Sequence, residues 1–332
     1  MAVVIYPKTL SWSYMKQRPQ QLMTHLGKLG HKVYFENPAP IEEQFTEVEP
    51  NVYLFTDAQR FIGRELPRLR GSERVVVWTT WAKQRTRIPL FRPDGVIYDC
   101  CDEFPQWARY EAPMVGYANH VVCSAEVIRQ RLELAYPEKG ITLIRNAADE
   151  RFLEREPLPR PADLPHGPVV GYIGAWAYWV DHPLVMTMAR WFPQVQFVSI
   201  GAAYGEVPTY EEYPNVHVLG ERPHEALQAY LQHFDAALIP FRYHPITLAT
   251  NPVKAYEYLA SGVRVLSTAL PECVAMHPHV VTATTHEDFG WKLGKLLSEA
   301  DSEEAREQRA AYAYRNRWEV RARQADALIR SI

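Results

Sequence analysis

Alternation of strand-like and helix-like segments constrains the fold of this chain more than any other sequence feature. Short runs rich in β-branched and aromatic residues recur between segments with helical spacing of apolar residues. In the first half, the predicted helices cover 18–29 and 124–136, the second capped by Ser124. The predicted strands there cover 2–6, 32–36, 51–55, 74–79, 95–99, 120–123 and 142–145.

The same alternation is repeated in the second half. Predicted strands cover 168–173, 196–200, 215–219, 236–240, 263–267 and 280–283, and predicted helices 183–191, 224–234, 251–261 and 287–299. Such alternation implies parallel sheets covered by helices on both faces. Ligands of these sheets bind at the carboxyl ends of the strands, where the strand order reverses. We therefore expect two doubly wound α/β domains facing a cleft.

Length and proline content predict the domain organisation. A chain of 332 residues suits two domains of about 150 residues each. Five prolines between Glu154 and Pro168 predict a stiff linker. We expect a first domain over 1–155, a linker over 156–167, a second domain over 168–305 and a C-terminal helix over 306–332. That last helix is predicted to start at an Asp301 cap, with Glu304 three residues later.

Composition excludes several classes of protein. No apolar run reaches the ~18 residues that span a membrane, and the opening strand does not resemble a signal peptide. The net charge of −3 argues against a nucleic-acid binder. The four cysteines lack metal-ligand spacing, and the vicinal Cys100 and Cys101 do not suit an ordinary disulfide. We expect a cytoplasmic protein with reduced cysteines.

The segment 251–262 carries the strongest sign of a binding site. Asn251 is predicted as the N-cap of a helix, Pro252 suits its first turn, and Gly262 marks its end. The apolar positions predict a buried stripe of Val253, Tyr256, Leu259 and Ala260.

Glu257 and Lys254 are the charged residues of this helix that suggest a ligand. A helix N-terminus binds phosphate, and Lys254 in the first turn opposes the helix dipole unless an anion lies nearby. Glu257, two turns into the segment, is placed to accept hydrogen bonds from a ribose diol. The alternatives are a solvated Glu257 paired with an arginine and a solvent-facing Lys254.

This segment resembles the C-terminal signature of GT-B glycosyltransferases of the retaining family 4 type. Other motifs resemble bacterial glycosyltransferases of cell-surface polysaccharide synthesis, in particular those of the teichuronic acid type. They lie in chain order at 17–22, 98–103, 144–149, 171–174 with Trp179 and Asp181, 214–220, 234–235 and 239–241. The resemblance implies a GT-B fold of two Rossmann-like domains, with Glu257 on the donor ribose. It also implies a last helix that crosses back to the first domain at Trp318; the alternative is a helix packed on its own domain.

The resemblance assigns further donor-side residues. Asn251, Pro252 and Lys254 would lie on the phosphate side, and Gly174 and Gly201 would form turns at strand ends. Gly220, Glu221 and Arg222 would frame the base, and Arg242 belongs to the loop expected to hold the sugar and phosphates. Structural turns and an ordinary surface charge at Arg222 are the alternatives.

The acceptor side is expected in the first domain. Arg18, Gln20 and Gln21 follow the loop after the first strand, and Trp12 in that loop would either stack on a sugar or cover the core. Asp99 and Asp102 follow the strand at 95–99 and are the candidate catalytic residues. A helix cap before Pro105 is the alternative for Asp102.

The chain departs from the family pattern at several positions. Ala249 replaces the usual first glutamate, Asp181 and His182 stand where an Arg and Lys pair is common, and the N-terminal Gly-rich loop is absent. No three-glycine dinucleotide fingerprint, P-loop or DxD motif occurs in the sequence. We therefore expect no metal and no cofactor other than a nucleotide sugar.

The expected function is metal-independent, retaining-type sugar transfer from a nucleoside diphosphate, UDP foremost, to a glycan or lipid-linked acceptor. A nucleotide-sugar epimerase and a non-catalytic nucleotide-sugar-binding partner are the alternatives. Between Asp57 and Arg92, nine basic residues accompany three acids. This stretch suggests peripheral contact with an anionic membrane, and a merely solvated surface is the alternative.

Overall fold

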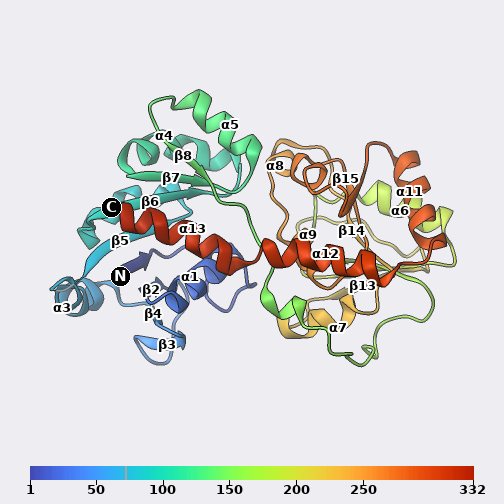
Figure 1. The fold of residues 1–332 in the computed structure, drawn as a ribbon, viewed down its shortest axis with the longest axis horizontal. Helices are drawn as coiled ribbons and strands as arrows, with labels where there is room; N and C mark the ends of the chain where they lie inside the picture. Colours follow the sequence, from blue (N-terminus) through green and yellow to red (C-terminus); the bar gives the residue numbers. More distant parts are fainter. Residues whose placement is uncertain (72) are drawn as a thin grey trace. The chain divides into compact units, whose positions relative to one another are not determined.

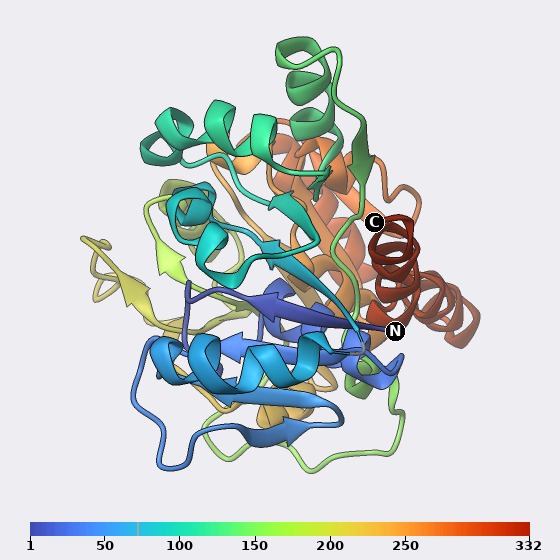
Figure 2. The same cartoon turned by 90° about the vertical axis from the view of Figure 1, so that its left-hand side faces the viewer.

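The computed structural model describes residues 1–71 and 73–332, which form two compact units. Unit 1 comprises Met1–Asn146 and Trp318–Ile332, and unit 2 comprises Ala147–Arg317. Each unit is a parallel sheet with helices packed against it (Figures 1 and 2). The predicted α/β class with two doubly wound units is thereby confirmed.

Unit 1 contains an eight-stranded sheet of order β3-β4-β2-β1-β5-β6-β7-β8. All neighbours pair in parallel except β3 with β4. Only β3 was not predicted, because its sequence TEVE is short and acidic, as suits an exposed edge strand. The strands are β1 (Ala2–Tyr6), β2 (Lys32–Glu36), β3 (Thr46–Glu49), β4 (Val52–Phe55), β5 (Arg74–Thr79), β6 (Gly95–Cys100), β7 (His120–Cys123) and β8 (Ile141–Leu143).

The helices of unit 1 include one that the sequence did not predict, α4, whose apolar pattern is weak and which contains Pro113. The Ser124 cap is wrong: α5 follows Ala125, and the Ser124 hydroxyl donates to the Cys101 carbonyl at 2.8 Å. The helices are α1 (Arg18–Lys28), α2 (Ala58–Arg60), α3 (Leu66–Arg70), α4 (Ala108–Tyr117), α5 (Glu126–Ala135) and α13 (Trp318–Ser331), with short helical turns at Phe61–Glu65, Ala82–Thr86 (η2), Ile88–Phe91 and Pro105–Trp107 (η4).

The C-terminal region forms two helices and not the single predicted one. α12 (Glu303–Arg315) belongs to unit 2 and α13 to unit 1. The Asp301 cap is wrong, because the Ser302 hydroxyl accepts from the Ala305 N–H while Asp301 pairs with Arg309 at 2.6 Å. α13 packs on α1 (Figure 1), and its Asp326 lies 2.7 Å from Nε2 of the fully buried His31.

Unit 2 contains a six-stranded parallel sheet of order β13-β11-β9-β14-β15-β16. The chain starts in the middle at β9, adds β11 and β13 on one side, and then β14 to β16 on the other. The strand order therefore reverses between β9 and β14, the place where doubly wound sheets bind ligands. The strands are β9 (Val169–Ile173), β11 (Gln196–Ile200), β13 (Val216–Gly220), β14 (Ala236–Ile239), β15 (Val265–Thr268) and β16 (Val280–Ala283), and β10 (Trp176–Ala177) pairs separately with β12 (Ala203–Tyr204).

The proline-rich segment lies inside unit 2, whereas the sequence analysis placed a linker over 156–167. The Leu158 N–H donates to the Gln232 side chain at 2.8 Å, and Leu164 is buried. The proline content of the segment does not reveal such contacts with the rest of the unit. The helices of unit 2 are α6 (His182–Trp191), α7 (Leu227–Leu231), α8 (Pro245–Leu248), α9 (Val253–Ala260), α10 (Pro271–Val274), α11 (His286–Ser298) and α12, with short turns at Glu150–Leu153 (η5) and His224–Ala226.

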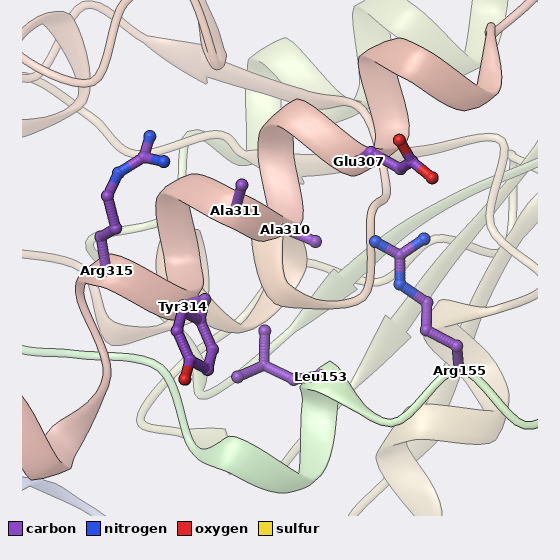
Figure 3. A pocket seen from close by; sticks show the side chains of 7 residues that line it. All are labelled: Leu153, Arg155, Glu307, Ala310, Ala311, Tyr314 and Arg315. Carbon is purple, nitrogen blue, oxygen red and sulfur yellow. The ribbon is translucent and has the colours of Figure 1, made fainter.

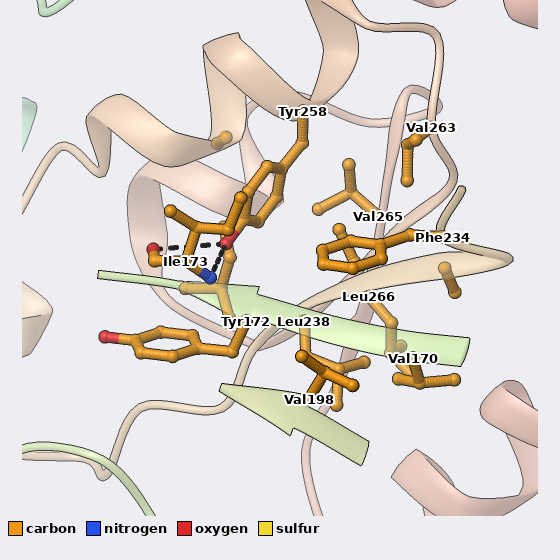
Figure 4. Close-up of a cluster of buried hydrophobic side chains, with 14 of the residues drawn as sticks. Val170, Tyr172, Ile173, Val198, Phe234, Leu238, Tyr258, Val263, Val265 and Leu266 are labelled. Atoms are coloured by element: carbon orange, nitrogen blue, oxygen red, sulfur yellow. Dashed lines mark hydrogen bonds between the residues drawn. The ribbon is translucent and has the colours of Figure 1, made fainter. Parts of the chain in front are cut away.

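One tyrosine side chain completes the sheet where the strand order reverses. β9 pairs with β14 only through Val170 and Gly171. Beyond them, Tyr258 of α9 accepts from the Ile173 N–H at 2.7 Å and donates to the Ile173 carbonyl at 3.2 Å (Figure 4). The buried backbone groups of the strand end are thus satisfied by a helix side chain, which couples α9 to β9.

We expect Tyr258→Phe to lower the free energy of unfolding by about 1–3 kcal/mol, because it leaves buried backbone groups of Ile173 unsatisfied. Urea unfolding measures the change. Tyr178→Phe is the matched control, because Tyr178 is 48% exposed and makes no hydrogen bond within the described residues. Equal free energies of unfolding for the two variants would show that the Tyr258 hydroxyl does not stabilise the fold by joining α9 to β9.

Candidate functional site

Three neighbouring strands of unit 2 end in glycines with positive φ. Gly174 follows β9 with φ +141°, Gly201 follows β11 with φ +145°, and Gly220 ends β13 with φ +73°. The Gly174 N–H donates to Ile200 at 2.8 Å, and the Gly201 N–H donates to Gly220 at 2.9 Å. A Cβ on Gly201 would lie 2.1 Å from the Gly174 oxygen, so only glycine fits there. The predicted turns are therefore present, and they present backbone without side chains.

We call Gly174, Gly201 and Gly220 the glycine layer. Lys254, in the first turn of α9, lies beside it. A Cβ on Gly174 would lie 3.0 Å from the Lys254 ammonium nitrogen. That nitrogen sits 5.2 Å from the Tyr172 ring centroid and 4.8 Å from that of Phe241. It makes no ion pair or hydrogen bond with any residue that the structure describes. Burial lowers the pKa of Lys254 to about 8, while the charge of the nearby Glu257 acts to raise it.

Glu257 lies one turn further along α9 and is 9% exposed. Across residues 1–71 and 73–332, its carboxylate has no hydrogen-bond or ion-pair partner. Burial raises the pKa of Glu257 to about 7, with His224 and Lys254 acting to lower it and Asp149 to raise it. The solvated alternative is wrong for this residue, because the side chain is buried.

Asp149 and His224 complete the surroundings of Glu257. His224 Nε2 lies 3.2 Å from the Asp149 carboxylate, and the Arg151 N–H donates to that carboxylate at 3.1 Å. Arg151 in turn pairs with Glu225 at 3.3 Å. The sequence analysis did not assign these residues to the site, although Asp149 lies in the motif at 144–149. Only the fold brings them beside α9.

The start of α9 differs from the prediction. The helix spans Val253–Ala260 with Pro252 at the N-cap position, so Asn251 is not its cap. The buried Asn251 amide donates to Glu272 at 2.6 Å and to the Tyr256 hydroxyl at 3.2 Å, so it is engaged inside the unit. The predicted stop is confirmed, with Gly262 at φ +78°. The one-sided stripe is wrong, because every residue over 255–260 is buried.

The remaining donor-side residues have mixed surroundings. Arg222 pairs with Asp163 at 2.5 Å and donates to the Leu219 carbonyl at 2.7 Å, so its guanidinium ties the proline-rich segment to the end of β13. Glu221 beside it is exposed. Arg242 is exposed, donates to the Val180 carbonyl at 3.2 Å, and has no carboxylate partner in the described structure.

In unit 1, Arg18 and Asp99 pair with each other. The guanidinium contacts both Asp99 oxygens, at 2.8 and 2.9 Å, and also donates to the Asn146 side chain at 3.1 Å. Trp78 donates to Asp99 at 3.1 Å, and both charged residues are buried, Asp99 completely. This contradicts an accessible catalytic Asp99 and an acceptor-binding Arg18: the two form an internal ion pair.

The neighbouring acceptor-side residues also make internal contacts. The Gln20 amide donates to carbonyls of the loop before α1, including that of Tyr14 at 3.0 Å, and Gln21 is buried. Trp12 meets Phe35 edge-on at 5.2 Å, which is the core-covering alternative. Asp102, like Trp12, is partly exposed, and burial raises the pKa of its carboxyl group. It does not cap a helix, because Phe104 occupies the N-cap of η4.

Among the described residues, no group of three or more His, Cys, Asp or Glu side chains is arranged to hold a metal ion. The four cysteines are free. None of the described helices is both long and apolar enough to cross a membrane.

A pocket of about 380 Å³ lies on α12, away from every residue that the sequence analysis singled out (Figure 3). Its lining includes Leu153, Arg155, Glu307 and Tyr314. It contains no residue of the glycine layer or of α9. The candidate site therefore consists of the glycine layer, Lys254 and Glu257.

We expect Glu257→Gln to stabilise the protein at alkaline pH. The folded pKa of about 7 exceeds the ordinary value of 4.5, so the wild type loses stability as pH rises between these values. The glutamine variant has no such loss. Its free energy of unfolding should exceed that of the wild type by up to about 3 kcal/mol near pH 8 and differ little from it near pH 4.5. Urea unfolding across this range, with the exposed Glu225→Gln as control, measures it. A pH-independent difference would contradict the raised pKa.

We expect Asp99→Ala to destabilise unit 1 by about 3–5 kcal/mol, because Arg18 is left buried without its counter-charge. Replacing both residues by apolar ones should recover most of the loss. Glu133→Ala, which breaks the exposed pair with Arg129, is the control and should cost about 0.5 kcal/mol or less. An Asp99→Ala variant as stable as this control would show that the pair is dispensable.

Comparisons with known proteins agree with this geometry. No known family profile matches the chain. The chain is 26% identical over 293 residues to the "Putative teichuronic acid biosynthesis glycosyltransferase TuaH" of Bacillus subtilis (strain 168), covering 78% of this chain and 72% of that protein. Anabaena HepE, solved with UDP and glucose, superposes with a TM-score of 0.71 at 12% identity, over 100% of both chains. A trehalose-6-phosphate synthase, OtsA, superposes with a TM-score of 0.74 at 10% identity, over 100% of this chain and 99% of its own.

The structural matches are too distant in sequence to show more than the fold. The sequence match is closer and spans most of both chains. The chain thus has the fold of the GT-B glycosyltransferases and is related in sequence to a glycosyltransferase named for teichuronic acid biosynthesis.

Proposed function

We propose that this protein is a glycosyltransferase that transfers a sugar from a nucleoside diphosphate, UDP foremost, to a glycan or lipid-linked acceptor. The observation that carries the proposal is a pair of charged residues on α9, the half-buried Lys254 and the buried Glu257, which make no direct hydrogen bond or ion pair within the described residues. They lie at the end of the sheet where ligands bind. Burying a charge without a partner is costly, and a ligand with complementary groups would compensate that cost.

A nucleoside diphosphate has the required groups. Its phosphates would lie on the glycine layer at the start of α9, where Lys254 and the helix N-terminus stabilise negative charge. Its ribose diol would donate to Glu257. Transfer leaves a diphosphate anion, and the same cation and dipole would stabilise the charge that develops on it.

The named relatives support the donor class. HepE was solved with UDP and glucose and with UDP-glucose, and a trehalose-phosphate synthase from E. coli with UDP-2-fluoro glucose. The relative named for teichuronic acid biosynthesis supports a role in polysaccharide synthesis. Retention of configuration and independence from metal are proposed from the family resemblance.

Asp102 is the proposed polar contact on the acceptor side. Of the two aspartates considered, it is the one with an exposed part and no ion pair within the described residues. Its carboxylate accepts a hydrogen bond from the Cys101 thiol at 3.4 Å, and burial raises its pKa. Arg18 and Asp99 would support it indirectly, by fixing the strand end from which it extends.

We expect UDP affinity to be greatest between about pH 7 and pH 8. Glu257 becomes protonated below that range and Lys254 loses its proton above it. Isothermal titration across pH measures the affinity. Glu257→Gln should remove the protein's contribution to the fall in UDP affinity at lower pH. Lys254→Met should remove its contribution to the fall in UDP affinity at higher pH. The phosphate of UDP titrates equally with all variants, so their differences isolate the two residues.

Ligand variants sharpen this experiment. Glu257→Ala should weaken the binding of UDP by about 1–3 kcal/mol but leave the binding of a dideoxyribose analogue unaffected. Lys254→Met should weaken the binding of UDP and leave the binding of uridine unaffected. Glu225→Ala is the control, as an exposed carboxylate of the same unit. If UDP, GDP and ADP all fail to bind, the proposal fails. Tight binding without turnover of any UDP-sugar would favour the non-catalytic alternative, which the alanine at position 249 permits.

A further inference from the structure

Two loops of unit 2 are joined by backbone contacts at the end of the sheet where ligands bind. One loop lies between β10 and α6, and the other lies between β14 and α8. They meet in an antiparallel bridge between Val180 and Phe241. The Arg242 N–H also donates to the Trp179 carbonyl at 2.9 Å, and Nε of Arg242 donates to the Val180 carbonyl at 3.2 Å. The side chains that these loops carry are therefore held in a fixed relation to one another.

The joined loops adjoin the candidate phosphate site. The Phe241 ring centroid lies 4.8 Å from the Lys254 ammonium nitrogen, and Arg242 is the next residue along the chain. In the proposed complex, Glu257 holds the ribose and Lys254 faces the phosphates one turn earlier on α9. The sugar of the donor is attached to the phosphate that lies farther from the ribose. It would therefore lie beyond Lys254, on the side of the joined loops.

The loops present aromatic rings and a free hydrogen-bond donor. Tyr178 is 48% exposed, and its ring meets those of Trp179 and His244 edge-on at 5.1 and 6.3 Å. Nδ1 of the exposed His244 accepts from the Ile246 N–H at 3.3 Å, so the proton is on Nε2, which has no hydrogen-bond partner in residues 1–71 and 73–332. Aromatic rings can pack on the C–H face of a sugar, and Nε2 can donate to a hydroxyl. We call Tyr178, Trp179, Arg242 and His244 the sugar-side surface.

Arg242 gives the sugar-side surface a positive charge. Its side chain is exposed, and its two terminal nitrogens make no hydrogen bond or ion pair with any residue that the structure describes. Asp181, the acidic residue of the facing loop, is already engaged: it accepts from the Leu184 N–H at 3.0 Å and lies 3.1 Å from Nε2 of His286. A guanidinium with both terminal nitrogens free can bind a carboxylate through two parallel hydrogen bonds.

We propose that the donor sugar carries a carboxylate, as in a nucleoside diphosphate uronic acid, and that Arg242 recognises this group. The inference deepens the proposed function and rests on it, since the place of the sugar follows from that of the diphosphate. A uronic acid has a carboxylate where the matching neutral sugar has a hydroxymethyl group. The neutral sugar would leave the guanidinium without its counter-charge. Arg242 would thus select the donor without taking part in the transfer step.

Isothermal titration with UDP, UDP-glucose and UDP-glucuronic acid tests the inference, together with the matching pair UDP-galactose and UDP-galacturonic acid. We expect one uronic acid to bind more tightly than its neutral counterpart. Arg242→Gln should weaken the binding of that uronic acid about tenfold, as expected for the loss of a hydrogen-bonded charge pair at an exposed site. The same variant should leave the affinities for UDP and for the neutral sugar nucleotide unchanged, which also shows that the donor site remains folded.

Arg315→Gln is the matched control, because Arg315 is an exposed arginine of unit 2 without a carboxylate partner among the described residues. It should change none of these affinities. Equal binding of the uronic acid and the neutral sugar in both pairs would overturn the inference. An Arg242→Gln variant that weakens UDP as much as the uronic acid would also overturn it, because Arg242 would then contact the diphosphate. Failure of UDP itself to bind would reject the proposed function, whereas UDP binding without a preference for the carboxylate would reject only this inference.

Discussion

The burial of α9 is the constraint on which unit 2 depends. Every residue over 255–260 is buried, so this helix is a central element and not a covering one. Its Tyr258 replaces β14 as the hydrogen-bond partner of the last residue of β9. The ends of β9 and β14 can therefore diverge, where the strand order reverses, without leaving backbone groups unsatisfied. The same separation leaves the start of α9 beside Gly174, where Lys254 lies.

The two charged residues of α9 lie in surroundings that disfavour charge and therefore lower the stability of the fold. Glu257 is buried and Lys254 is half-buried, their pKa values are shifted toward neutrality, and neither makes a direct ion pair within the described residues. Tyr172 and Phe241 compensate part of the cost at Lys254 through their ring faces. The Asp149–His224 pair contributes opposing effects at Glu257. Unpaired buried charges of this kind are expected at sites where a ligand supplies the missing partner.

Unit 1 contains the opposite arrangement of charge. Arg18 and Asp99 satisfy each other with two further polar partners, Trp78 and Asn146, and solvent does not reach the carboxylate. Two exposed cations, Lys83 and Arg109, instead have no carboxylate partner among the described residues. Internal pairing thus separates the residues that hold the unit together from exposed cations that contribute no ion pair to it.

The sequence by itself determined the layout of this protein. The spacing of apolar residues identified every strand of the two main sheets except β3. Glycine positions identified the end of α9 at Gly262 and the turns after β9 and β11. These features could be predicted because they depend on local backbone preferences. Glu257 and Lys254 were also found, because a carboxylate and a lysine on an otherwise apolar helix are unusual. Tertiary structure alone decided which polar residues face each other. Arg18 and Asp99 lie 81 positions apart, and Asn251 meets Glu272 through packing that no local pattern records. A polar residue after a strand has the same sequence signature whether it awaits a ligand or neutralises a buried partner, since the difference lies in contacts distant along the chain.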